Sequence, residues 1–321
     1  MRSVAVQQLA LQVRQRADLS GQQNAFGSNS GGNITDTEML AMLNASYAEL
    51  WDILTEKFGE NYSFNTYNLP IAQGTYDYQL PFDFFKLLGV DLALDNTLQN
   101  WSQIKPYTLK DRNLFSYPLQ PYLAYPGWQN IRYMVQGQII DFQPKLGPFP
   151  GNVRVWYIPA CPTLCASLPV AWASSTATAQ NALVYASVTV NGETQNFVFL
   201  ALNSGTTGGS APSWNVPGTT SDNGIFWAAQ APLSLYATTA DGVDGWEDYI
   251  VLDSAIKSLA KQQRPADVFE AQKQALMARI NRAAKDRIAG DPTVISGGFG
   301  ALEGGPSYGG YFNGFGFGGG W

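Results

Sequence analysis

The chain has 321 residues, of which 45% are hydrophobic and only 14% are charged, and its formal net charge is −6. An acidic surface has no basic field that would bind phosphates regardless of sequence, so non-specific nucleic-acid binding is disfavoured. The sequence contains no histidine, which excludes histidine-based nucleophile systems and removes the commonest general base and metal ligand. We therefore expect no catalytic residue, no metal site and no cofactor, and the low charge is typical of a subunit rich in interfaces.

Two helices are expected near the start of the chain. The first follows an apolar stripe between Val4 and Asp18. The second begins at Thr35, because Thr35 and Glu38 have the spacing of a capping box, and it ends at Gly59. Its apolar residues recur at helical spacing: Met39, Leu43, Tyr47, Leu50, Leu54 and Phe58.

From Tyr62 to about Ile158 the apolar residues alternate with polar ones, which predicts strands. A hairpin is expected around Gln136–Gly137, and a further strand runs through Val153 and Tyr157. Frequent prolines confine these strands to short pieces. We expect a small antiparallel β-layer that contains more loop than sheet.

A separate unit is expected between residues 170 and 230, where charged residues almost disappear. Asn191–Gly192 is a turn that two-residue β-hairpins favour, and Phe197 and Phe199 alternate beyond it. A short final strand is expected at Ile225–Ala229. The change in composition predicts a small β-domain inserted into the rest of the chain.

Helices return after residue 240. Asp244 is placed to cap a helix that starts at Trp246, and Pro265 suits the first turn of the next helix. The last helix carries one apolar face: Phe269, Leu276, Ile280 and Ala284. These observations predict an α+β fold in which the N- and C-terminal helices form one α-helical bundle. The predicted core covers residues 1–169 and 231–291, with the insertion at 170–230 and a C-terminal arm at 292–321.

Two groups of residues, a set of carboxylates and a pair of cysteines, invite a chemical interpretation. The four carboxylates at the start of the late helix would suit a glycosidase pair, although helix capping explains them fully: Asp241, Asp244, Glu247 and Asp248. Cys161 and Cys165 are either a local disulfide or two inert thiols. No run of eighteen apolar residues occurs, so we expect no membrane association.

A basic cluster lies at the end of the last helix: Arg279, Arg282, Lys285 and Arg287. These side chains are candidates for phosphate contacts in a channel through which DNA passes. A helix C-terminus favours cations for electrostatic reasons alone, so a purely solvated face is the alternative.

The C-terminal arm has a single charge, Glu303, and is rich in glycine and aromatic residues. Such a segment is expensive to order alone, and its rings favour docking into pockets of a partner. The alternative is a flexible, sticky terminus. The candidate docking residues are Phe299, Tyr308, Tyr311, Phe312, Phe315, Phe317 and Trp321.

Thr35–Pro159 and Asp241–Asp291 resemble the head-to-tail connector adaptors of tailed bacteriophages, the tail-tubular-A-like group. The resemblance lies in the order and spacing of several segments: ITDTEMLAMLNASYAEL from Ile34, YQLPFDFFKLLGV from Tyr78, RYMVQGQIIDFQP from Arg132, VRVWYIP from Val153 and WEDYIVLDSAIKSLAKQ from Trp246. Most such adaptors lack the insertion, and few end in so long an aromatic arm.

This resemblance implies a structural protein of the virion neck and no enzymatic activity. It implies a homo-oligomeric ring of twelve subunits beneath the portal protein, with helices around a channel for double-stranded DNA that is not read by sequence. The β-elements would face the downstream tail or nozzle protein, and the arm would reach up into the portal.

The inserted unit, at about residues 172–227, resembles a small β-module of phage virion proteins. The resemblance rests on LNSGTTGGSAPSW from Leu202 and SDNGIFW from Ser221. It implies that Trp172, Trp214 and Trp227 stack on a glycan, as in carbohydrate-binding modules. The alternative is that these rings form the module's own core. The second functional hypothesis is therefore a tail-associated, carbohydrate-binding virion protein.

Overall fold

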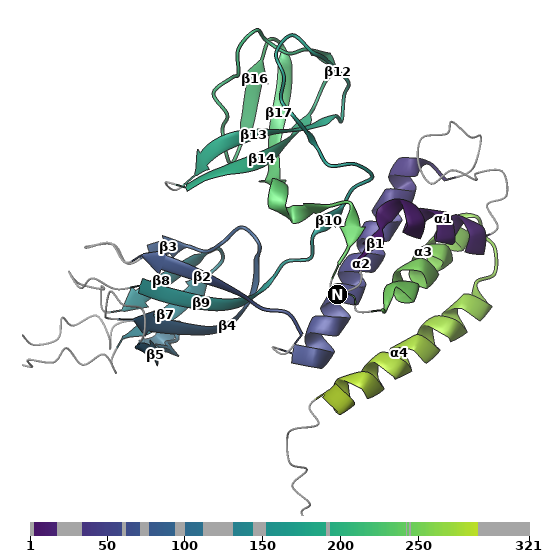
Figure 1. Ribbon diagram of the computed structural model, residues 1–321, viewed down its shortest axis with the longest axis horizontal. Helices are drawn as coiled ribbons and strands as arrows, with labels where there is room; N and C mark the ends of the chain where they lie inside the picture. Colours follow the sequence, from purple (N-terminus) through teal and green to yellow (C-terminus); the bar gives the residue numbers. More distant parts are fainter. Residues whose placement is uncertain are drawn as a thin grey trace, which may run out of the picture.

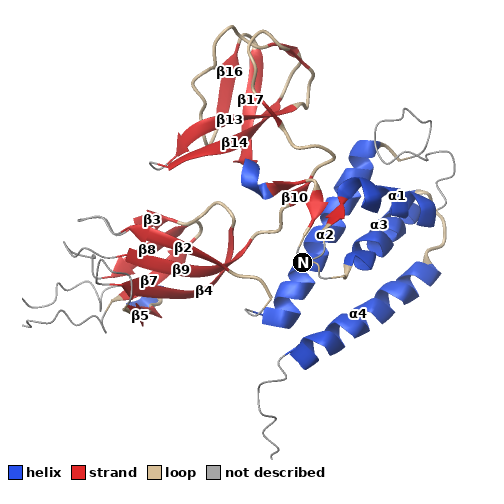
Figure 2. Cartoon of the chain, viewed as in Figure 1, coloured by secondary structure: helices blue, strands red, loops and turns tan. Residues whose placement is uncertain are grey.

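The structure is a computed structural model that describes residues 3–17, 34–59, 62–70, 77–93, 100–111, 131–143, 152–190, 193–241, 243 and 245–287. Within these ranges the chain is a mixed α+β protein, so the predicted α+β class is confirmed. Figure 2 shows the long helices gathered on one side, most strands in two separate groups, and the short strands β1 and β10 beside the helices. Each of the three parts has its own hydrophobic core.

The helical part is formed from both ends of the chain (Figure 1). Its elements are α1 (Val6–Arg16), α2 (Asp36–Phe58), α3 (Glu247–Lys261) and α4 (Asp267–Arg287). Helix α3 packs against each of the other three. Its side chains are buried on nearly every face, whereas the described side chains of α4 that are buried in the shared core are Leu276, Ile280 and Ala284.

Helix α2 begins as the sequence predicts. The Glu38 amide donates to the Thr35 hydroxyl at 3.3 Å, and the Thr35 amide donates to the Glu38 carboxylate at 2.9 Å, which completes the capping box. Gly59 follows the last turn with φ 61°, a left-handed conformation that favours glycine. All six apolar residues predicted for this helix are buried.

Two helices begin one or two residues later than the sequence predicts. Helix α3 begins at Glu247, and Trp246 occupies the N-cap without a capping side chain; Asp244 lies outside the described residues. Near the N-terminus, β1 (Val4–Ala5) precedes α1 and pairs with β19 (Thr239–Ala240). This pairing joins segments more than 230 residues apart in sequence, so local periodicity did not indicate it.

The β-layer consists of two four-stranded sheets, which is more sheet than the sequence predicts. One sheet has the order β2 (Asn65–Pro70), β9 (Asn152–Pro159), β4 (Phe84–Ala93), β5 (Trp101–Gln103). The other has the order β3 (Asp77–Gln79), β8 (Ile139–Gln143), β7 (Arg132–Gln136), β6 (Lys105–Pro106). The short 3-10 helix η2 (Leu109–Asp111) follows β6 in the chain. All pairs are antiparallel except β6 with β7. The predicted hairpin around Gly137 is present as β7–β8.

The second group of strands forms the module. Its five-stranded sheet has the order β11 (Val170–Ala171), β13 (Leu183–Val190), β14 (Glu193–Ala201), β17 (Ile225–Pro232), β16 (Thr219–Asp222). A separate pair joins β12 (Ala177–Thr178) to β15 (Gly205–Thr206). Val190 pairs with Glu193, the register of a two-residue turn, although residues 191–192 themselves lie outside the described ranges.

The module is connected to the rest of the protein by two neighbouring segments. β10 (Thr163–Leu164) leads into it and pairs in parallel with β18 (Tyr236–Ala237), which leads out after the 3-10 helix η4 (Leu233–Leu235). The module also touches the β-layer, because the rings of Phe82 and Phe197 meet edge to face with centroids 5.0 Å apart. Figure 1 shows the module above the β-layer, with β10 beside the helices.

Candidate functional site

The predicted portal-docking residues all lie outside the described residues. They are Phe299, Tyr308, Tyr311, Phe312, Phe315, Phe317 and Trp321. Helix α4 is the last described element before this arm. The docking role therefore stays a prediction.

Arg279 and Arg282, two of the predicted DNA-channel residues, are exposed on α4. The Arg279 guanidinium lies over the Trp246 ring, 5.6 Å from its centroid, so this charge also holds α4 against the start of α3. The side chains of Lys285 and Arg287 lie outside the described residues. The structure thus leaves both described arginines exposed on α4, with Arg279 beside α3.

A network of ion pairs joins α2, α3 and α4. The Lys273 ammonium on α4 donates to Asp253 at 2.8 Å and to Glu49 at 2.9 Å. Lys257 reaches the same Asp253 carboxylate from one turn further along α3, at 2.5 Å. The sequence pattern alone did not single out Asp253 as part of an ion-pair network. The signal in the sequence is that Asp253 is a carboxylate among the apolar residues of this helix.

The charges in this network determine the titration of Asp253. Burial raises the pKa of its carboxyl, but the hydrogen bonds from Lys257 and Lys273 outweigh burial and hold the pKa below its ordinary value. Burial likewise lowers the pKa of Lys273, and its bonds to Asp253, Tyr249 and Glu49 raise it above its usual range. Both groups are therefore charged at neutral pH, and they fix the position of α4.

The three tryptophans predicted to contact a glycan belong to the core of the module. Trp227 is fully buried and offers no ring face to a ligand. Trp214 is half-buried and packs on Phe199 with ring centroids 4.2 Å apart, and Trp172 meets Trp214 edge to face at 6.4 Å. A glycan role for Trp172 or Trp214 stays a prediction, limited to whatever part of each ring remains exposed.

A buried carboxylate ties the module together. Asp222 accepts from the Trp172 indole at 2.9 Å and from the Gly208 amide at 2.8 Å. A Cβ at Gly208 would lie 2.7 Å from the Asp222 oxygen, so only glycine allows this contact. The sequence gives a signal here, since both residues fall in the two motifs of the module.

The carboxylates at the start of α3 are engaged within the fold. Asp248 pairs with Arg16 of α1 at 3.0 Å, and Asp241 accepts from the Thr239 hydroxyl at 3.0 Å. Glu247 is buried in the first turn of α3, where a negative charge complements the helix dipole. These contacts give each described carboxylate of the group a structural role.

Both cysteines are free thiols. Burial raises the pKa of Cys161 to about 12, with a further contribution from Asp52. Burial also raises the pKa of Cys165, whose thiol donates to the Ala237 carbonyl at 3.4 Å. The thiolate, which is the reactive form, is therefore scarce at neutral pH.

One face of the β-layer carries a half-buried aromatic cluster that the sequence did not indicate. The Arg154 guanidinium lies 3.9 Å from the ring centroid of Trp101 and 5.9 Å from that of Trp156. The Trp156 indole donates to Asp91 at 2.6 Å. Tryptophan and arginine are the residues most often found at the energetic centre of protein interfaces.

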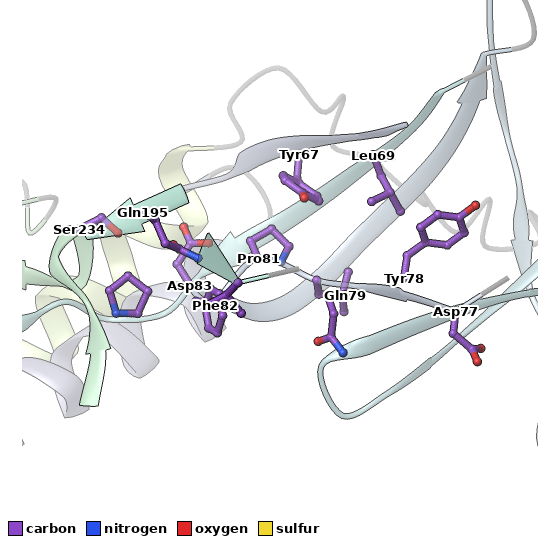
Figure 3. Close-up of a pocket in the computed structure, with 13 residues that line it drawn as sticks. Tyr67, Leu69, Asp77, Tyr78, Gln79, Pro81, Phe82, Asp83, Gln195 and Ser234 are labelled. Atoms are coloured by element: carbon purple, nitrogen blue, oxygen red, sulfur yellow. The ribbon is translucent and has the colours of Figure 1, made fainter. Parts of the chain in front are cut away.

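A cavity of about 640 Å³ lies between the β-layer and the module (Figure 3). Its β-layer side is formed by β2, β3 and the turn that follows β3, and its module side by β13, β14, the end of β17 and η4. Strands β2 and β3 are the edge strands of their sheets, so the cavity opens along both edges. The residues that line it are Tyr67, Leu69, Asp77, Tyr78, Gln79, Leu80, Pro81, Phe82, Asp83, Val190, Gln195, Pro232 and Ser234.

Among the described helices, none is long and apolar enough to cross a membrane. Comparison of the sequence with known protein families gives no match, and comparison with curated proteins gives none either.

Proposed function

We propose that this protein is a structural subunit of a virion, a neck adaptor that forms a homo-oligomeric ring between the portal and the tail. The observation that carries the proposal is the shared core of α1 to α4, which brings both ends of the chain into one helical unit. This arrangement agrees with the segments that resemble connector adaptors, since these include α2 and α3.

In this proposal the helices form the bundle that surrounds the DNA channel. Helix α4 buries only one face in the core of its own subunit, so the opposite face is available to a neighbour or to the channel. Arg279 and Arg282 are both exposed on α4, and Arg279 also covers the Trp246 ring at the start of α3. The net charge of −6 weakens attraction to phosphates elsewhere, which leaves double-stranded DNA free to slide.

The β-layer would face the downstream tail or nozzle protein. Its cluster of Trp101, Arg154 and Trp156 lies on one face of the first sheet and has the composition of an interface centre. The arm would leave the end of α4 and insert its aromatic side chains into the portal ring.

Removal of the arm tests this arrangement. Deletion of Gly297–Trp321 should abolish binding to the portal protein of the same virion, because the aromatic anchors are lost. The thermal unfolding of the deleted protein should match that of the full chain, since the three described cores do not include this segment. A second variant keeps the arm at full length and replaces only its aromatic residues with serine, and it should lose portal binding as well. Portal binding that survives both changes would refute the docking role of the arm.

A further inference from the structure

Two residues that line the cavity between the β-layer and the module are held in place by residues that do not line it. The Asp83 carboxylate accepts from the buried hydroxyl of Tyr157 at 2.8 Å. Phe82 is fixed by its edge-to-face contact with Phe197, a fully buried core residue of the module. Pro81 and Pro232 add backbone that has little freedom to move. The cavity is therefore organised before any ligand enters.

The charged residues that line the cavity determine which ligands it favours. The two carboxylates, Asp77 and Asp83, are accompanied by no lysine or arginine among the described residues that line the cavity. An anionic ligand would be repelled by these groups. An ammonium ligand would be attracted to the carboxylates, but it has no acceptor for the amide N–H groups of Gln79 and Gln195 and would leave them to solvent.

A neutral, polyhydroxylated ligand satisfies every part of this lining. Sugar hydroxyl groups donate to the carboxylates and accept from the glutamine amides, and the apolar face of a sugar ring packs against an aromatic ring such as Tyr67. The volume of about 640 Å³ lies within the range of small-molecule sites, roughly 300–1,000 Å³.

We propose that this cavity is a binding site for a neutral oligosaccharide. Figure 3 shows Tyr67 and Leu69 on one side, with Asp77 toward one end and Asp83, Gln195 and Ser234 toward the other. This elongated arrangement suits a short chain of sugar rings. The site is separate from the tryptophan core of the module and needs both the β-layer and the module. It does not depend on the neck-adaptor function.

Ligand-observed saturation-transfer NMR on the full chain tests the proposal. The probes are three neutral trisaccharides, maltotriose, cellotriose and triacetylchitotriose, with glucuronate and choline as charged comparisons. At least one trisaccharide should show transfer and bind more tightly than either charged probe. Gln79→Ala and Gln195→Ala, from opposite walls, should each weaken that binding by roughly five- to tenfold. Gln103→Ala, an exposed glutamine on β5 outside the cavity, is the matched control and should leave binding unchanged.

Thermal unfolding of each variant shows whether the fold is retained. Gln195→Glu is a second variant at this position, and it preserves the size of the side chain while adding a negative charge. It should weaken binding as Gln195→Ala does. The proposal is overturned if none of the trisaccharides binds, or if glucuronate or choline binds equally well. It is also overturned if folded Gln79→Ala or Gln195→Glu protein keeps its full affinity.

Discussion

Lys273 of α4 and Asp253 of α3 form a hydrogen-bonded ion pair of 2.8 Å, and the Asp253 side chain is only 6% exposed. The same ammonium also bonds Glu49 of α2 at 2.9 Å. Helix α4 buries Leu276, Ile280 and Ala284 in the helical core, and this polar contact is a second attachment of α4 to the other helices. The position of α4 matters for the proposed ring, since its exposed side would face the channel or the next subunit.

Replacement of Lys273 with methionine should therefore loosen α4. The change leaves the Asp253 carboxylate with one ammonium partner fewer, and the free energy of unfolding should fall by about 1–3 kcal/mol. Urea unfolding followed by circular dichroism measures this. Arg282→Met, an exposed change on the same helix, is the control and should stay within about 0.5 kcal/mol of the wild type. Equal stability of the two variants would show that the ion pair contributes nothing.

The carboxylates of the helical part should make it sensitive to acid. The hydrogen bond from Lys261, followed by that from the Thr35 amide, lowers the pKa of Glu38 from 4.5 to about 2. The pKa of Asp253 is lowered as well: burial raises it, but the hydrogen bonds from Lys257 and Lys273 outweigh burial. A lowered folded pKa gives stability that is fully present above the unfolded pKa and is lost as the pH falls through the folded value.

The stability of the helical part should thus decline as the pH falls from about 4 toward 2. Carboxyl NMR titration of Glu38 should give a midpoint near pH 2. In Lys261→Met the midpoint should rise toward 4.5, because the principal cause of the shift is removed. An unchanged midpoint in that variant would contradict the assigned cause.

The capping box of α2 offers a local test. Thr35→Ala removes the acceptor of the Glu38 amide and should cost roughly 1 kcal/mol of stability. Thr35→Ser keeps the hydroxyl and should retain most of the wild-type stability. Thermal unfolding compares the two, and an equal loss in both would point to lost packing of the threonine methyl instead.

Local signals predicted the helices best. Thr35, Glu38 and Gly59 lie within one helix, so their spacing determines where it begins and ends. The start of α3 was mispredicted because Trp246, a residue with no capping side chain, occupies the N-cap. A helix that is buried on nearly all faces depends on packing more than on capping.

The sheets and the cavity depend on pairings that local pattern does not specify. Strand β2 pairs with β9, and the segment between them is about eighty residues long. Alternation indicates that such strands exist and leaves their partners open. The cavity needs Gln195 of the module beside Asp83 of the β-layer, a relation between two separate cores. No spacing in the sequence predicts it.

The module should unfold without the rest of the protein when its buried carboxylate is removed. Asp222→Ala leaves the Trp172 indole and the Gly208 amide without their acceptor, at about 1–3 kcal/mol for each donor. Hydrogen exchange measured by mass spectrometry should rise in β13, β14 and β17 and stay unchanged in α2 and α3, because the cores are separate. Gly208→Ala should act in the same way, since its Cβ would displace the carboxylate. Faster exchange in the helices as well would mean that the module and the helical part unfold together.

The most direct test of the neck-adaptor proposal is electron microscopy of the full-length protein mixed with the portal protein of the same virion. The proposal predicts closed rings of one fixed subunit number, twelve by the resemblance to connector adaptors, stacked coaxially on the portal. Monomers or trimers that never associate with the portal would contradict it.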